Sequence, residues 1–85
     1  MDIAEARVMA ALNTAGALTP DQLLARSRLT ADRLRTVLAA LRDRGHIERH
    51  TDPLRSSWVL TAQGSAWAKS TPGKAAMAVP KAADG

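Results

Sequence analysis

The feature that most constrains the fold is the stretch from Thr30 to Gly45, which predicts one amphipathic α-helix over residues 30–44. Its apolar residues recur at the i, i+3, i+4, i+7 spacing of a single helix face: Leu34, Val37, Leu38 and Leu41. The Thr30 hydroxyl can accept a hydrogen bond from the first turn, and Gly45 suits the left-handed position after the last turn. Because the leucine face has to be buried, we expect the rest of the chain to pack around this helix.

The face opposite the leucines carries small and acidic residues, with arginines on both flanks. It comprises Asp32, Thr36, Ala39, Ala40 and Asp43, with Arg35 and Arg42 on one side and Arg33 and Arg44 on the other. Small side chains edged by cations suit a helix that approaches another molecule closely. The whole chain carries twelve Lys and Arg against eight Asp and Glu, a net charge of +4, and the positive excess begins at this helix.

Two helices are predicted before this one. The first covers residues 2–15. The second starts at residues 19–22, where a threonine cap, a proline at the first helical position and a glutamine form a capping box, and it runs to about Arg26. Residues 27–29 then make a tight turn into the long helix. Two helices joined by so short a turn, the second longer and edged with arginines, have the outline of a helix-turn-helix.

Residues 46–60 predict a β-hairpin. Ile47 sits among polar residues in 46–50, and Trp58 and Leu60 alternate with polar or exposed positions in 57–60, which we interpret as period-two patterns. The segment between them is rich in turn formers. A hairpin directly after the second helix of a helix-turn-helix is a wing. A further helix is predicted from Thr61 to about Lys69.

These elements predict a mainly helical α+β fold, a winged helix-turn-helix with the order helix-helix-helix-strand-strand-helix. It is expected over residues 1–69, followed at 70–85 by a disordered tail of alanine, lysine, proline and glycine. The 85 residues provide for one small core, which is aliphatic since the only aromatic side chains are Trp58 and Trp67. We expect both to cover the core, with Trp67 as the alternative anchor of a protein interface.

Several function classes are excluded by what the sequence lacks. It has no cysteine, which rules out disulfides, thiolate metal sites and cysteine nucleophiles. His46, Glu48 and His50 share one face of a predicted strand, but a third histidine is missing, so we predict no metal there. No catalytic constellation and no glycine-rich phosphate loop stand out, so we predict neither an enzyme nor a cofactor. No apolar run is long enough for a membrane span, and we expect a cytoplasmic protein.

Residues 18–64 resemble the winged helix-turn-helix regulators of the bacterial MarR-like and related classes. The resemblance rests on residues 18–25, on 41–49 (LRDRGHIER) and on 58–64 (WVLTAQG). Residues 41–49 are similar to the segment of the family in which the recognition helix ends and the wing begins. Residues 58–64 are similar to the segment in which the wing ends and the next helix begins. The resemblance implies sequence-specific duplex DNA binding by a small prokaryotic or phage transcriptional regulator, with helix 30–44 in the major groove and hairpin 46–60 as the wing. From its size and class we also expect a homodimer.

The resemblance also implies where the DNA contacts lie. The candidates on and before the recognition helix are Arg28, Thr30, Asp32, Arg33, Arg35 and Thr36, and those on the wing are Arg49 and Arg55. Arginine pairs bidentately with guanine and aspartate accepts from cytosine, each good pair discriminating by roughly 1–3 kcal/mol. Arg28 would hold the backbone without reading sequence.

Two other interpretations of these residues stay open. An amphipathic helix carries similar side chains on any solvated face, and Asp32 and Asp43 repel phosphates. Winged helices also serve as modules that dock on a partner protein, which the acidic residues, the modest net charge and Trp67 would fit. Salt separates docking from DNA binding, because phosphate-driven binding weakens steeply between about 50 and 200 mM salt and apolar docking hardly responds.

Overall fold

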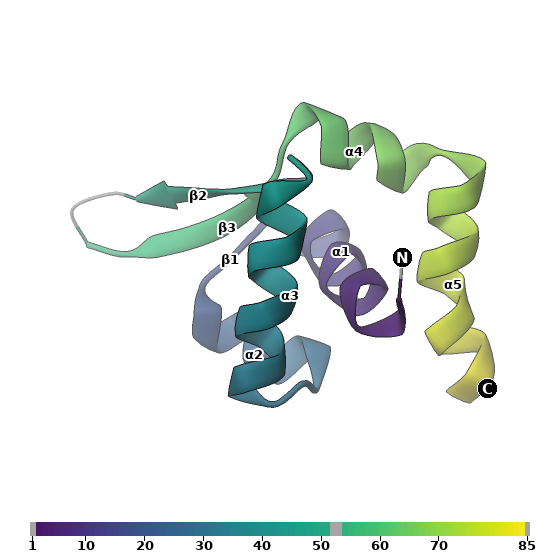
Figure 1. Cartoon of the computed structure of the whole chain (residues 1–85), viewed down its shortest axis with the longest axis horizontal. Helices are drawn as coiled ribbons and strands as arrows, with labels where there is room; N and C mark the ends of the chain where they lie inside the picture. Colours follow the sequence, from purple (N-terminus) through teal and green to yellow (C-terminus); the bar gives the residue numbers. More distant parts are fainter. Residues whose placement is uncertain (1, 52–53, 85) are drawn as a thin grey trace.

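The computed structural model describes residues 2–51 and 54–84. Within these ranges the chain forms five helices and three strands, in the order α1 (Ile3–Ala15), β1 (Ala17–Leu18), α2 (Pro20–Ser27), α3 (Ala31–Asp43), β2 (Ile47–Thr51), β3 (Ser56–Leu60), α4 (Ala62–Lys69) and α5 (Thr71–Asp84). Figure 1 shows α3 near the centre, with the β2–β3 hairpin projecting to one side and α4 and α5 on the other. The predicted helix-turn-helix with its wing is confirmed. Among the described helices, none combines the length and the apolar character needed to cross a membrane.

Side-chain caps set the beginnings of the first three helices. At α1, the Glu5 amide donates to Asp2 Oδ1 at 2.8 Å and the Asp2 amide donates to Glu5 Oε1 at 3.1 Å. Thr19 and Gln22 form the predicted capping box at α2, and Thr30 caps α3. These bonds satisfy amides that have no partner within their own helix, so each helix starts at a defined residue.

Left-handed residues turn the chain after α2 and after α3. Arg28 ends α2 with a φ of 60°, which leads into α3 as predicted. Gly45 follows α3 with a φ of 77°. The amides of Gly45 and His46 donate to the carbonyls of Arg42 at 2.9 Å and Leu41 at 3.0 Å. This pair of bonds is a Schellman motif, and it directs the chain from α3 into the wing.

The core lies between α1, α2, α3 and the sheet. Each of the four apolar residues predicted for the buried face of α3 is at most 8% exposed. They pack in one cluster with apolar residues of the other elements: Val8, Met9, Leu12, Leu18, Leu23, Ile47 and Trp58. Burying one such side chain contributes roughly 1.5–3 kcal/mol. Trp58 is therefore a core residue, as predicted, and Trp67 is partly buried against the same cluster.

The sheet has the strand order β1-β3-β2 and is antiparallel throughout. In the wing, Ile47 pairs with Leu60 at the base and Thr51 pairs with Ser56 near the tip. Strand β1 was not predicted, because two residues are too few to show an alternating pattern. It joins β3 where Leu18 pairs with Trp58. The middle of the predicted turn, residues 52–53, lies outside the described residues.

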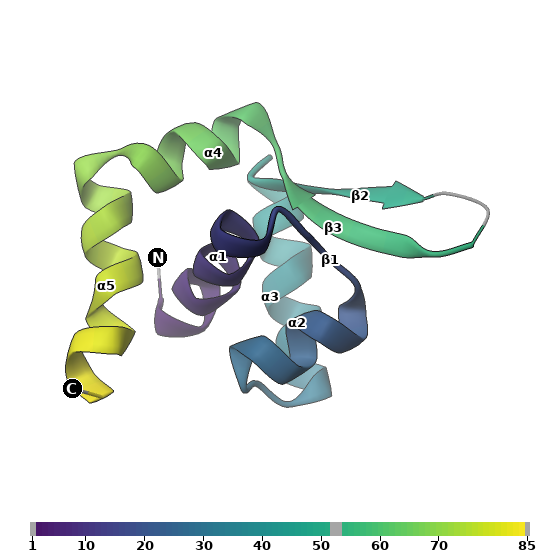
Figure 2. The ribbon, with the colours of Figure 1, turned by 180° about the vertical axis from the view of Figure 1, so that it is seen from behind.

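The prediction of a disordered tail over residues 70–85 has to be corrected, because the structure has helix α5 over Thr71–Asp84. Alanine-rich sequence has high helix propensity, which the low complexity of this segment concealed. The Ser70 side chain accepts from the Gly73 amide at 3.0 Å and donates to the Trp67 carbonyl at 2.6 Å, which fixes the corner between α4 and α5. Met77 packs against the core cluster, and α5 contacts α1 (Figure 2).

Candidate nucleic-acid interface

The outer face of α3 is exposed along its N-terminal half. Asp32 and Arg35 form an ion pair of 3.5 Å between Oδ1 and Nη1, with their side chains 90% and 78% exposed. The Thr36 hydroxyl donates to the carbonyl of Asp32 at 3.2 Å, and the Thr30 hydroxyl accepts from the Arg33 amide at 3.2 Å. Both threonine hydroxyls are therefore engaged within the helix. Asp32 and Arg35 are the side chains on this face that a ligand would meet in solution.

One flank of α3 is joined to α1 by two ion pairs. Arg33 Nη2 lies 3.4 Å from Asp2 Oδ2, and Arg44 Nη1 lies 3.3 Å from Glu5 Oε2. The Glu5 side chain is only 8% exposed, so its charge is largely shielded from water and faces Arg44. Arg33, predicted to contact DNA, is thus held by α1. The sequence could not separate Arg33 and Arg44 from the arginines of the other flank, because their pairing depends on where α1 packs.

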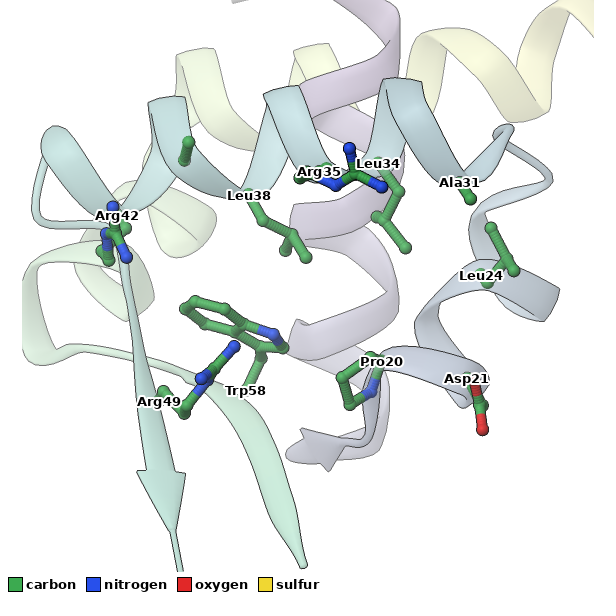
Figure 3. Close-up of a pocket in the computed structure, with 11 residues that line it drawn as sticks. Pro20, Asp21, Leu24, Ala31, Leu34, Arg35, Leu38, Arg42, Arg49 and Trp58 are labelled. Atoms are coloured by element: carbon green, nitrogen blue, oxygen red, sulfur yellow. The ribbon is translucent and has the colours of Figure 1, made fainter.

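The other flank of α3 faces the wing across a groove of about 430 Å³. Arg35 and Arg42 come from α3, and Arg49 comes from β2 (Figure 3). We call this the basic groove and define it by these three arginines and by an apolar floor of Leu24, Leu34, Leu38 and Trp58. Asp21, at the start of α2, is the acidic residue among those that line it.

Arg49 is held in place by the aromatic ring beneath it. Its guanidinium carbon lies 5.1 Å from the centroid of the Trp58 ring, within the range of a cation–π contact. Trp58 is 5% exposed and fixed in the core, so this contact fixes Arg49 against the groove. Arg42 forms a long ion pair, 4.0 Å from its Nε to Asp43 Oδ1, between well-exposed side chains. Such a pair is worth little in water, which leaves the Arg42 charge available to a ligand.

The remaining predicted residues lie apart from the basic groove. Arg28 is exposed at the end of α2, and Arg55 is exposed at the start of the returning wing strand. The Trp67 ring lies 6.0 Å from the His46 ring at a tilt of 54°, so it packs on its own domain. Its role as an interface anchor stays a prediction. His50 pairs with Glu48 at 3.1 Å, and His46 Nδ1 lies 3.3 Å from the Arg44 carbonyl, so these side chains do not converge on a common point.

Sequence reasoning missed Arg42 as a site residue. Arg42 is seven residues after Arg35, two helical turns further along the same flank. That spacing was visible in the sequence, but the side of the helix on which the wing lies was not. Arg49 was predicted for the wing, whereas its contact with Trp58 became apparent only from the register that places the two residues opposite each other.

Comparison with known proteins places this geometry in a family. A sequence profile of the DprA winged helix domain matches residues 2–52. No curated protein sequence matches the chain significantly.

Several solved structures share the fold. The oxidized form of MarR from E. coli is 27% identical, with a TM-score of 0.69 over 74% of this chain and 46% of that one. A probable transcriptional regulator from Pseudomonas aeruginosa is 27% identical, with a TM-score of 0.74 over 85% and 55%. A mutant MarR from E. coli complexed with operator DNA is 25% identical, with a TM-score of 0.70 over 78% and 49%.

The present chain spans about half the length of these structures. One of them is a probable transcriptional regulator, and another is a complex with operator DNA. What they share with this chain is the arrangement of helices and wing described above. The chain belongs to the DprA winged helix domain family, and its fold is the winged helix of MarR-family regulators.

Proposed function

We propose that this chain binds duplex DNA, with α3 in the major groove and the wing beside it, and that it regulates transcription. The observation that carries the proposal is the convergence of Arg35, Arg42 and Arg49 on the basic groove (Figure 3). A helix in the major groove and a wing over the neighbouring minor groove have one phosphate backbone between them. The basic groove, between α3 and the wing, is where that backbone would run.

Charge and shape in the groove suit a phosphate backbone. Guanidinium groups form bidentate hydrogen bonds with phosphate oxygens, and Arg49 is already oriented by Trp58. Helix α3 has 13 residues, about 20 Å at 1.5 Å per residue, and its outer face has small side chains that allow close approach to the bases. The major groove, about 12 Å wide, admits such a helix.

Base reading falls to the exposed outer face at the start of α3. Asp32 can accept from the amino group of cytosine, whereas Arg35 lines the basic groove and would contact the phosphate backbone. Thr30 and Thr36 contribute mainly by holding the helix, because their hydroxyls are engaged within it. Arg28 would contact a phosphate, and Arg55 on the wing would contact a phosphate or the minor groove. The homodimer, the cytoplasmic location and the bacterial or phage origin stay predictions from size and class.

Docking on a partner protein is the second candidate function. Asp32 and Asp43 are both exposed on the outer face of α3, where carboxylates would repel a phosphate backbone. The floor of the basic groove is apolar, which an apolar side chain of a partner could fill. This alternative predicts binding that is insensitive to salt.

The test is binding to random-sequence duplex DNA between about 50 and 200 mM salt, followed by fluorescence anisotropy. We compare the wild type with an Arg35→Ala, Arg42→Ala double variant. The matched control is Lys69→Ala, Lys74→Ala, which removes the same charge from exposed positions of α4 and α5, on the other side of the molecule from the wing (Figure 1).

Each phosphate contact contributes about 0.9 to the slope of log affinity against log salt concentration. We therefore expect the groove variant to lower the slope by nearly 2 and to weaken binding, and the lysine control to change the slope much less. Equal effects of the two variants would mean that only net charge attracts DNA, which contradicts a backbone site in the groove. Absence of wild-type binding at low salt would contradict the DNA-binding proposal and favour docking on a protein.

A further inference from the structure

The tip of the wing presents an apolar side chain to solvent. Of the large apolar side chains that the structure describes, only Ile3 and Leu54 are exposed, at 54% and 94%. Ile3 lies in the first turn of α1, on the body of the domain. Leu54 lies between β2 and β3, the two strands of the hairpin that projects away from the helices (Figure 1). At 94% exposure, the Leu54 side chain presents nearly all of its apolar surface to solvent.

The length of the wing sets where this leucine would meet DNA. Strand β2 has five residues, which at 3.3–3.4 Å each span about 17 Å. One turn of duplex DNA rises about 34–36 Å, so the centre of a major groove and the centre of the adjacent minor groove are separated by about half of that. With α3 in the major groove, the tip of the wing reaches the minor groove.

The two residues at the tip match the chemistry of a minor-groove wedge. Proteins that kink DNA insert leucine and similar apolar side chains between base steps from the minor groove. Arg55 is exposed next to Leu54 in the chain, and arginine is attracted to the negative potential of a narrow, A·T-rich minor groove. A wing that met only phosphates would be better served by a polar residue at the position of Leu54.

We propose that Leu54 acts as an apolar wedge that enters the minor groove at a flexible base step, partly unstacks it and bends the duplex. This inference rests on the proposed DNA binding and adds a distortion of the DNA to it. Pyrimidine–purine steps such as TA unstack most readily, so Leu54 would favour sites with such a step half a helical turn from the bases that α3 contacts. The chain would then select its DNA site partly by how easily the base steps of that site unstack and bend.

The probe is a duplex of about 20 base pairs, two helical turns, of alternating thymine and adenine. It carries a fluorophore pair at its ends to report bending and 2-aminopurine in place of one adenine to report unstacking. The variants are Leu54→Ser and Leu54→Met, and the control is Ile3→Ser, the same kind of change at the other exposed apolar residue. Anisotropy measures affinity on the same samples.

We expect the wild type, Leu54→Met and Ile3→Ser to bring the duplex ends together and to raise 2-aminopurine fluorescence. Leu54→Ser should bind within about tenfold of the wild type, about 1.4 kcal/mol, and leave the duplex straight. Binding by both the wild type and Leu54→Ser with the same end-to-end distance and the same 2-aminopurine signal would overturn the wedge and leave DNA binding intact. Absence of wild-type binding would overturn the proposed function itself, and the wedge with it.

Discussion

The contact between α4 and the base of the wing can be tested by adding a single methyl group at Gly64. This glycine is buried in the first turn of α4, where the space that a Cβ would occupy is taken by the backbone of His46 at the start of the wing. A Cβ at position 64 would lie 2.9 Å from the carbonyl carbon of His46 and closer still to its oxygen. That oxygen also accepts from the Thr61 amide at 3.0 Å, so it cannot move freely.

Gly64→Ala therefore sets two effects of opposite sign against each other. Helix propensity favours alanine over glycine by about 1 kcal/mol. Overpacking against a rigid backbone costs up to about 3 kcal/mol, since neither side of the contact is a flexible side chain. We expect a net loss of about 2 kcal/mol in the free energy of unfolding, which for a domain of this size lowers Tm by roughly 8–16 °C.

Thermal and urea denaturation followed by circular dichroism measure this difference. The control is Ala66→Gly, at an exposed position of the same helix, where propensity alone should cost about 1 kcal/mol. Propensity alone predicts that Gly64→Ala is more stable than the wild type, whereas the close approach to His46 predicts the reverse. A Gly64→Ala variant as stable as the wild type, or more stable, would refute the steric argument.

Two further predictions concern the contacts around α3. Glu5→Ala removes half of the capping box and the ion pair with Arg44, and we expect it to lower the free energy of unfolding by about 1–2 kcal/mol. Glu5→Gln keeps the capping box and should lower the free energy of unfolding by less than about 1 kcal/mol, measured by urea titration of both variants. Equal losses for the two variants would mean that the capping box does not contribute to the difference. Arg49→Ala uncovers the Trp58 ring, and we expect a loss of about 0.5–1 kcal/mol with a red shift of the emission, measured in a Trp67→Phe background. Unchanged emission would mean that Arg49 does not cover the ring in solution.

The parts of the fold that the sequence predicted are those set by local interactions. The caps at Thr19 and Thr30 and the turn at Gly45 act over three or four residues, so the residues themselves reveal them. The apolar stripe of α3 and the single apolar positions within the wing strands likewise need only the spacing along the chain. Strand β1 and helix α5 were missed because the first is too short for a pattern and the second has the composition of a disordered segment.

The candidate site was predictable only in part, because it depends on contacts between distant segments. Arg33 and Arg35 have the same local context, and only the packing of α1 beside one flank of α3 pairs Arg33 with Asp2. In a helix glycine has low propensity, and nothing near Gly64 in the sequence shows why one is placed there; in the structure, a side chain at this position would collide with the backbone of His46. Such roles depend on how helices and strands pack against one another, and the spacing of residues along a single sequence does not reveal that packing.

The strand order of the small sheet has a consequence for the behaviour of many copies together. Strand β3 is central, and β2 is an edge strand whose outer side has no further strand among the described residues. Exposed edges of this kind template the growth of intermolecular sheets unless charged side chains interrupt them. Glu48, Arg49 and His50 are all exposed along β2. These charged side chains therefore oppose edge-to-edge pairing between copies of the chain, and Arg49 among them also lines the basic groove.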